Sequence, residues 1–500
     1  MEDEPHLLQT PAFRQAVAAI QRRAEKSMEL GDLAEVFVRS DLFDRVHSPD
    51  SQVILGRRGT GKTHLLRAFQ KEAVEHGELA LYIDCTRLGS GYGGSDQAPE
   101  VIGRKYFIAF LNQFGTDLLD EALRMEWPDL KMQNGIIGKL TEGFVRAMEP
   151  SSGTPESLFN YRQISDSLEQ VVEDLGAHRV YVILDEWAQV PLDAQPFLAE
   201  FLKRGVLCVP RITAKILAVN YQYKFSVRHN GNRIGLERGA DIPDSIDMDR
   251  YLVYDEKREF VTKFFAQLLY NHLGFHLQWD LSAPERHKEA EVVKRLFTQQ
   301  KVFVELVRAA EGNCRDFLCI FSRAYFDEFR QSAASKAISA PNVVKAAISW
   351  FDSEKAGNVY AEATARETLE YLVNHVLKGY KSRTFLVESS KAENPRLVRL
   401  LRERVLHRLN GTYSHPDRPG VRHDLFTIDY GTFARLRGTV NQVREQVFWE
   451  DAESRDELSD RERRLMVPVD DRRSIRRITF DPDDLTVAGD AAGGSELFDR

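Results

Sequence analysis

The stretch Gly56-Arg57-Arg58-Gly59-Thr60-Gly61-Lys62-Thr63 constrains the fold of this chain more than any other feature. It satisfies the pattern G-x-x-x-x-G-K-[ST], follows a short apolar run and opens a helical run. The glycines let the backbone turn so that successive N–H groups converge on a phosphate, and a helix start adds its positive end. The sequence therefore predicts a phosphate-binding loop between a buried strand and a helix.

Apolar strands that alternate with helices predict the architecture around this loop. Short apolar runs bounded by turn residues are the predicted strands, and segments with helical periodicity lie between them. We expect strands at 51–55, 80–83, 180–184 and 215–219, and helices at 12–30, 63–75, within 101–176 and at 192–203. This alternation is typical of an α/β fold, a parallel sheet with helices on both faces.

Two acids at the end of the strand predicted at 180–184 supply the second half of a nucleotide site. Asp185 is placed to hold Mg²⁺, largely through water, together with the hydroxyl of Thr63. Glu186, one residue further on, is the candidate general base that activates water. The alternative is an ordinary strand end capped by surface acids. The Asp-Glu pair favours hydrolysis over phosphoryl transfer to a small substrate.

Other motifs narrow the nucleotide to ATP. The chain contains no Asn-Lys-x-Asp, which guanine-specific GTPases carry, and no Leu-Ser-Gly-Gly, which marks transporter cassettes. We therefore expect an ATPase with ATP and Mg²⁺ as its cofactors, in which Lys62 meets the β- and γ-phosphates. The residues expected to contact the nucleotide are Gly56, Arg57, Arg58, Gly59, Thr60, Gly61, Lys62, Thr63 and His64.

The sequence argues against a membrane protein, a secreted protein and a protein stabilised by a metal site or by disulfides. No apolar run approaches the roughly 18 residues that cross a bilayer. The start, Met1-Glu2-Asp3-Glu4, lacks the basic and apolar regions of a signal peptide. The four cysteines are scattered without a C-x-x-C pair, which supports neither a metal site nor a disulfide framework. We expect a cytoplasmic protein with no membrane partner.

The motifs and their order resemble the AAA+ ATPases, closest to the origin-recognition and initiator-like branch and its bacterial relatives. After the Asp-Glu strand comes the strand Lys215 to Val219, which ends at Asn220. Further on, Gly312-Asn313-Cys314-Arg315 opens a helix. The resemblance covers about residues 30–438. It implies that Asn220 is sensor 1, which places water near the γ-phosphate, and that Arg315 is sensor 2, which reaches the same phosphate from a helical lid. A strand-end Asn that makes a turn, and a surface Arg near a helix start, are the alternatives.

The same resemblance implies an adenine contact from Phe37 or Val38 and an arginine donated by a neighbouring subunit. Arg228, Arg233 and Arg238 lie in the right interval for that arginine, and no motif selects among them. It also implies a domain order, which the periodicity supports: helices only at 255–273, 287–310, 314–331 and 341–355, then a winged-helix order. The predicted domains are an N-terminal helix 1–30, the AAA+ domain 31–252, a lid 253–358, a winged-helix-like domain 359–440 and a charged extension 441–500 with a disordered end.

The winged-helix-like region is basic. Residues 371–438 hold thirteen Lys or Arg against six acids, a local charge of +7 in a chain whose net charge is −8. A helix expected at 395–409 carries Arg396 and Arg399, and the tip of a hairpin flanked by 411–413 and 425–428 carries Arg418 and Arg422. Such a helix and wing would bind duplex DNA. A solvated basic face or a protein-docking surface is the alternative.

The predicted function is an ATP-driven molecular switch that acts on DNA or on a DNA-bound complex, with a homo-oligomer or a partner protein expected. The nucleotide state would control the positions of the lid and the winged helix. The main rival is a signalling or antiviral-defence ATPase, in which the nucleotide gates oligomerisation or a protein partner. A third possibility is a structural ATP binder without turnover, against which Glu186 argues.

Overall fold

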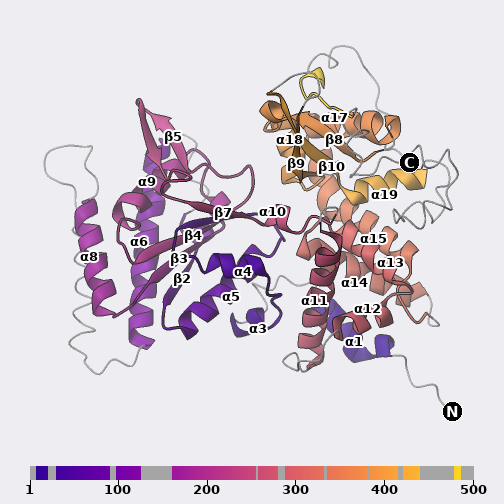
Figure 1. Ribbon diagram of the computed structural model, residues 1–500, viewed down its shortest axis with the longest axis horizontal. Coiled ribbons are helices and arrows are strands. Elements are labelled where there is room, and N and C mark those ends of the chain that lie inside the picture. The colour runs from indigo at the N-terminus through magenta and orange to yellow at the C-terminus, as the bar shows by residue number, and fades with distance from the viewer. Residues whose placement is uncertain are drawn as a thin grey trace. The chain divides into compact units, whose positions relative to one another are not determined.

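The structure is a computed structural model that describes residues 7–20, 30–89, 97–124, 160–254, 257–279, 288–331, 335–380, 382–414, 420–439 and 478–485. The chain divides into two compact units, one formed by Ala24–Met248 and the other by Met1–Arg23 with Asp249–Arg500 (Figure 1). None of the described helices combines the length and the apolar character needed to cross a bilayer.

A five-stranded sheet forms the centre of the Ala24–Met248 unit. Its strands are β1 Gln52–Leu55, β2 Leu79–Asp84, β3 Val180–Asp185, β4 Ile212–Ala218 and β7 Asp244–Asp247, in the order β2-β3-β4-β1-β7. All four neighbouring pairs are parallel, so the predicted fold class is confirmed. Because parallel strands end at the same edge, the residues that follow β1, β3 and β4 gather there.

Helices cover both faces of this sheet. The helix α5 Lys62–Glu75 packs on one face, where Phe69 meets Tyr181 of β3 at 4.9 Å between ring centroids. On the other face lie α6 Pro99–Arg124, α8 Tyr161–Asp174 and α9 Gln195–Gly205 (Figure 1). These three helices share one apolar core with alternate residues of the strands. The short helices α3 Leu30–Glu35 and α4 Asp41–Val46 precede β1. Burial on both faces explains why the central strands are almost continuously apolar.

Three strands of this unit were not predicted. β5 Ser226–His229 and β6 Asn232–Gly235 form a two-stranded antiparallel hairpin, closed by Asn230 and Gly231 in the left-handed region. β7, which pairs with β1 at the edge of the main sheet, is rich in polar residues and so lacks the apolar pattern of the central strands. The short helix α10 Met248–Tyr251 follows it.

The second unit contains a set of packed helices. They are α1 Pro11–Ala19, α11 Arg258–Leu277, α12 Lys288–Leu296, α13 Gln300–Ala309, α14 Cys314–Gln331 and α15 Ala340–Phe351. The N-terminal helix α1 belongs to this unit, since Phe13 packs on Tyr325 of α14 and Ser322 Oγ donates to the Val17 carbonyl at 3.3 Å. The rest of the helix predicted at 12–30 lies largely outside the described residues.

The prediction of one helix over 287–310 is wrong. The segment forms α12 and α13, which are separated at Phe297. There the chain leaves the helical path to pair with Ile338: the Thr298 amide donates to the Ile338 carbonyl at 3.0 Å, and the Ile338 amide donates to the Leu296 carbonyl at 2.8 Å. A contact with a distant segment has therefore overridden the local periodicity.

The C-terminal module of the same unit carries a three-stranded antiparallel sheet in the order β8-β10-β9. Its elements are α16 Gly357–Tyr360, α17 Ala363–Leu372, a π-helix Val373–Gly379, β8 Thr384–Glu388, α18 Pro395–Arg402, β9 Leu406–Ser414, β10 Arg422–Ile428 and α19 Tyr430–Thr439. A π-helix Asp352–Ala356 continues α15 of the helical part and leads into this module. The order helix, strand, helix and hairpin, from α17 to β10, is the order predicted for this region. The assignment as a winged helix stays a prediction.

Two predictions for this module need correction or completion. The helix expected at 395–409 ends at Arg402, because Arg404 adopts φ 60° and the following residues pair with β10. Part of the predicted extension is ordered against the module: the amides of Leu386 and Phe480 donate hydrogen bonds of 2.8 Å to the carbonyls of Ile478 and Leu386, respectively. The remainder of 441–500 lies outside the described residues.

Candidate nucleotide site

The loop that follows β1 has the backbone geometry that a phosphate cradle needs. Gly59 and Gly61 have φ of 92° and 95°, in the left-handed region that favours glycine, and Gly61 caps α5. A Cβ on Gly56 would lie 2.7 Å from Thr60 Oγ1. Each of these three glycines therefore has a steric reason to be glycine, and the loop leads directly into the positive end of a 14-residue helix.

Lys62 lies over the loop that it follows. Its Nζ atom donates to the carbonyl oxygens of Gly56 at 2.7 Å and Arg57 at 3.0 Å. The ammonium group is thus held by two carbonyl oxygens of the loop that leads into α5. A cation in this position complements an anionic ligand bound at the helix start.

Asp185 is fixed at the end of β3 by three donors. Thr63 Oγ1 donates to Asp185 Oδ2 at 2.9 Å, the Tyr82 hydroxyl donates to the same oxygen, and the Glu186 amide donates to Oδ1 at 2.7 Å. The two residues predicted to hold Mg²⁺ therefore lie side by side, although 122 positions separate them in the chain.

Tyr82 and Arg67 belong to this site and were not predicted. Burial and the charge of Asp185 raise the pKa of the Tyr82 phenol, which stays a hydrogen-bond donor. The Arg67 guanidinium carbon lies 3.3 Å from the centroid of the Tyr82 ring. Only the register of β2 beside β3 brings Tyr82 to Asp185, so a motif search has no signal for it.

Glu186 adopts φ 53° and ψ 39°, a left-handed conformation that is uncommon for Glu. Such backbone strain tends to occur where function requires a particular placement. Its Oε2 atom is buried and has no hydrogen-bond partner among the described residues. The carboxylate is therefore available to accept a proton at the same edge of the sheet as Asp185 and the loop.

Asn220 lies two residues beyond β4, and β4 lies between β1 and β3. The Gln222 amide donates to the Val219 carbonyl at 3.0 Å and closes a tight turn around Asn220. The predicted sensor 1 residue is thus at the edge of the sheet that carries the loop and Asp185. The turn-forming role, weighed as the alternative, is also met, so the sensor role stays a prediction.

The remaining candidates in this unit are three arginines and two residues that precede β1. None of them takes part in the hydrogen bonds described above for the phosphate loop. Arg228 and Arg233 face each other across the β5–β6 hairpin and are exposed, as is Arg238, which donates to the Tyr223 hydroxyl at 3.0 Å. Phe37 is half-buried against Phe43, with 5.2 Å between their ring centroids. Val38 is buried. These positions do not indicate which arginine would reach a neighbouring subunit, or whether Phe37 or Val38 would contact adenine.

Arg315, the predicted sensor 2 residue, is the second residue of α14 in the other unit and is half-buried. Gly312 in the preceding turn has φ 73°, and a Cβ there would lie 2.6 Å from the Leu252 carbonyl oxygen. Asn313 Oδ1 accepts from the Asp316 amide at 3.1 Å and so caps the helix. The Gly-Asn pair of the motif is therefore explained by packing against Leu252 and by helix capping.

The predicted DNA-binding arginines differ in how they are engaged. Arg396 lies 3.6 Å from Glu367, and Arg399 lies 2.7 Å from Glu362 and 3.6 Å from Glu403. Arg422 is exposed at the start of β10, and Arg418 lies outside the described residues. The helix face thus carries ion pairs, and the hairpin offers an exposed cation.

The described residues contain no group of three or more His, Cys, Asp or Glu side chains arranged to hold a metal ion. The Thr63–Asp185 pair is a different kind of site, in which two protein oxygens complement phosphate and water ligands. It supplies the hard oxygen donors that Mg²⁺ prefers.

Comparisons with known proteins agree with the motif analysis over part of the chain. A family model described as ORC-CDC6-like matches residues 22–86, which include β1, the phosphate loop and α5. No curated protein matches the chain.

Solved structures that match the chain include the Orc1 protein of Aeropyrum pernix in complex with DNA, at 12% identity and a TM-score of 0.32, over 85% of this chain and 96% of that one. A single-residue variant of RuvB from Thermotoga maritima matches at 10% identity and a TM-score of 0.32, over 83% and 93% of the two chains. At these scores the structural likenesses carry no argument about activity. The predicted resemblance to the initiator-like AAA+ ATPases is confirmed by the family match, over the segment that contains the phosphate loop.

Proposed function

We propose that this protein binds and hydrolyses Mg·ATP and uses the nucleotide state to control its C-terminal module. One observation carries the proposal: the Thr63 hydroxyl and the Asp185 carboxylate are 2.9 Å apart, at the sheet edge where a glycine-rich loop opens α5. Phosphate and Mg²⁺ are the ligands that this combination of backbone amides, a lysine and two hard oxygens serves best.

Each residue of the site has a role in this proposal. The amides of the loop and Lys62 bind the β- and γ-phosphates, and Lys62 exchanges its contacts with Gly56 and Arg57 for phosphate oxygens. Thr63 and Asp185 hold Mg²⁺, which supplies charge neutralisation at the phosphates when it is bound. Tyr82 and the Glu186 amide orient the Asp185 carboxylate through their hydrogen bonds.

Glu186 accepts a proton from the attacking water at Oε2. That atom is buried without a hydrogen-bond partner among the described residues, which supports this assignment. Asn220 orients the same water through its amide. The water oxygen bonds to the γ-phosphorus as the bond to the leaving ADP breaks, so the products are ADP and phosphate.

Glu186→Gln tests the assignment of the base. The amide cannot accept the proton, so we expect turnover to fall by at least about a hundredfold while the Kd for Mg·ATP stays within a few-fold of wild type. Lys62→Ala should instead abolish binding, because the loop loses its cation. Unchanged turnover in Glu186→Gln would move the general base elsewhere, and unchanged affinity in Lys62→Ala would end the assignment of the loop.

We retain DNA, or a DNA-bound complex, as the target, on the strength of the ORC-CDC6-like match and the exposed Arg422. The rival, nucleotide-gated contact with a protein or a second copy of the chain, is favoured by a specific observation. Arg396 and Arg399 of α18 are ion-paired with acids of their own module. Titrating duplex DNA with ATP at several salt concentrations separates the two, because phosphate contacts make log Kd depend on log salt. Affinity without salt dependence, or no affinity, would promote the rival.

A further inference from the structure

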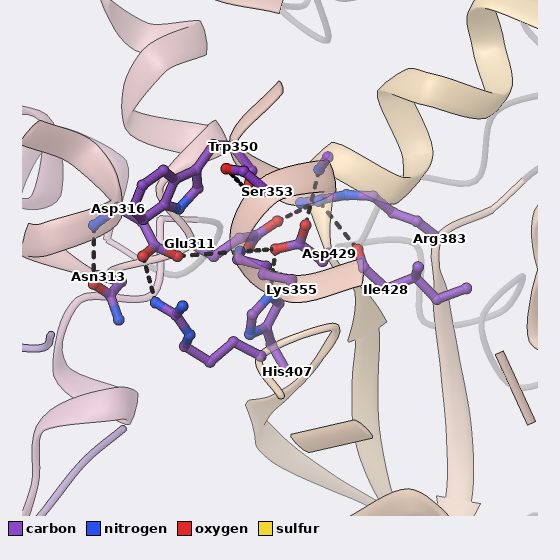
Figure 2. Close-up of polar contacts among 12 residues, drawn as sticks. Glu311, Asn313, Asp316, Trp350, Ser353, Lys355, Arg383, His407, Ile428 and Asp429 are labelled. Atoms are coloured by element: carbon purple, nitrogen blue, oxygen red, sulfur yellow. Dashed lines mark hydrogen bonds and ion pairs between the residues drawn. The ribbon is translucent and has the colours of Figure 1, made fainter. Parts of the chain in front are cut away.

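A chain of buried charges runs from the start of α14 into the C-terminal module (Figure 2). Lys355 Nζ lies 3.1 Å from Asp316 Oδ2 and 2.7 Å from Asp429 Oδ1. Arg404 Nη1 lies 2.5 Å from Asp316 Oδ1, and His407 Nε2 lies 3.0 Å from Asp429 Oδ1. Arg404 is the most exposed of these five side chains, at 15%. Charges this well buried are retained only when each has a partner.

These charges come from separate elements of the fold. Asp316 is in the first turn of α14, Lys355 in the π-helix that continues α15, and Asp429 between β10 and α19. Arg404 lies between α18 and β9, and His407 lies in β9. The network therefore ties the helical part of the unit to three places in the C-terminal module.

A second ion pair lies on the other side of Arg315. Glu311 pairs with Arg383, the residue before β8, and Arg383 also donates to the Ile428 carbonyl at 3.4 Å. Arg315 thus lies between two carboxylates that ion pairs hold in place: Glu311, four positions before it, and Asp316, the next residue. The partners of these two anchors, Arg383 and Arg404, lie just before β8 and β9 of the C-terminal sheet.

The backbone between the two anchors has little freedom to bend. Glu311 and Gly312 are both left-handed, with φ of 49° and 73°, and the carbonyl of Leu252 fills the space beside Gly312. Asn313 caps α14 through the Asp316 amide. A displacement of Arg315 by movement of the main chain therefore displaces the whole helix start.

The charge balance of the network opposes separation of its elements. Asp316 and Asp429 face Lys355 and Arg404, two anions and two cations, with His407 beside them. Burial raises the pKa of Asp316, but Lys355 and Arg404 outweigh it and hold that pKa below its ordinary value. Pulling α14 away from the module would leave a buried carboxylate without a partner, which is far more costly than losing a surface pair.

We infer that Asp316 and Arg404 are positioning residues, which couple Arg315 to the β8–β10 sheet so that the two move as one piece. A nucleotide that draws in Arg315 then moves the C-terminal module without any direct contact with it. This inference rests on the proposed role of Arg315 as the nucleotide sensor, and it names the route by which the proposed switch acts.

The double variant Asp316→Asn with Arg404→Gln tests the coupling. It removes one anion and one cation, so the Lys355–Asp429 pair remains and the network stays balanced. We expect the Kd for ATP to stay within about twofold, and kcat to fall about tenfold or more because Arg315 is no longer held in place. ATP should also no longer change the hydrogen exchange of peptides that cover 384–388 and 422–428.

Arg435→Gln is the matched control. Arg435 pairs with Asp352 and so also links the C-terminal module to the helices, but its side chain is 34% exposed and that of Asp352 is 41% exposed. We expect this variant to keep the ATP-dependent change in exchange. Arg404→Lys, which keeps a cation beside Asp316, should keep at least half of that change, and it serves as the test if the double variant does not fold.

The outcomes separate this inference from the proposed function. ATP-dependent exchange of the sheet that persists in the double variant, or disappears in a folded Arg404→Lys, overturns the coupling while ATP hydrolysis stands. The coupling is also overturned if the double variant loses ATP affinity and turnover by similar factors, because the substitutions have then damaged the nucleotide site as a whole. If Arg315→Ala leaves both turnover and exchange unchanged, the sensor assignment itself fails.

Discussion

Gln195 is expected to be a sensitive residue of the Ala24–Met248 unit outside the candidate nucleotide site. It is the first residue of α9 and is 1% exposed. Its Oε1 accepts from Trp187 Nε1 at 3.0 Å and from the Lys224 amide at 2.7 Å, and its Nε2 donates to the carbonyls of Val190 at 3.0 Å and Gln222 at 3.2 Å. One amide thus joins the turn that follows Glu186 to the turn that follows Asn220.

The loss in free energy of unfolding caused by Gln195→Leu follows from the buried polar groups that lose their hydrogen-bond partner. The change keeps the side-chain size, but Trp187 Nε1 and the Val190 carbonyl make fully buried bonds to Gln195 and lose them. An unsatisfied buried polar group costs about 1–3 kcal/mol, so these two together give about 2–6 kcal/mol. The bonds from Lys224 and to Gln222 are only part-buried, so water replaces them at little cost.

Hydrogen-exchange mass spectrometry of β3 and β4 peptides measures this loss in the unit itself. A destabilisation of about 2 kcal/mol speeds the slowest amides by roughly 30-fold, and larger losses speed them more. Gln113→Leu is the control, because Gln113 is exposed on α6 and bonds only to Asp117 at 2.7 Å among the described contacts. Under the proposed function, ATP turnover should fall more than ATP affinity, because the two turns carry Glu186 and Asn220, the residues assigned to the attacking water. Exchange in Gln195→Leu that matches the Gln113→Leu control would refute the reasoning.

Two further changes test single features of the fold. Gly312→Ala should lower the free energy of unfolding of its unit by more than about 2 kcal/mol, because of the left-handed φ and the 2.6 Å approach of the new Cβ to the Leu252 carbonyl oxygen. Gly420→Ala, with φ 92° and open space around the Cβ, should cost only about 1 kcal/mol, and urea titration measures both losses. Burial lowers the pKa of Lys215 from 10.5 to about 7. Between about pH 7 and pH 10.5, Lys215 is protonated in the unfolded chain and mostly neutral in the folded one. The free energy of unfolding, relative to that of Lys215→Met, should therefore rise with pH in this range, by up to about 1.4 kcal/mol per pH unit. A difference that stays flat across this pH range would show that Lys215 remains charged in the fold.

The central α/β layer was predictable because its signals are local. The strands β2, β3 and β4 were each located to within three residues, since short apolar runs bounded by turn residues are typical of strands buried on both faces. The spacing of the loop and the acids then determined which side chains meet, and Thr63 and Asp185 do meet. The β5–β6 hairpin was also signalled, by Asn230-Gly231 between two short strands, although we did not predict it.

Other features depend on contacts that no local pattern records. Tyr82 reaches Asp185 only because β2 lies beside β3, and the break at Phe297 depends on a strand-like pairing with Ile338. Gln195 looks like an ordinary polar residue at a helix start, and its importance comes from two turns that converge on it. Hydrophobic periodicity identifies elements, whereas these residues are defined by how the elements meet.

The charge of the C-terminal module shows the same limit, and it bears on the choice between DNA and protein as the target. Among the described residues, at least seven of the thirteen basic residues of 371–438 have acidic partners, namely Arg383, Lys391, Arg396, Arg399, Arg404, Arg408 and Arg435.

Most of those partners, such as Glu311, Asp316 and Asp352, come from outside residues 371–438. A count along the sequence gives +7, but acids from other segments offset much of that charge in space. Counterion release depends on phosphates neutralised by cations that are not already paired within the protein. A DNA-binding surface on this module must therefore be built from exposed cations such as Arg422, and its salt dependence will be shallower than the sequence count implies.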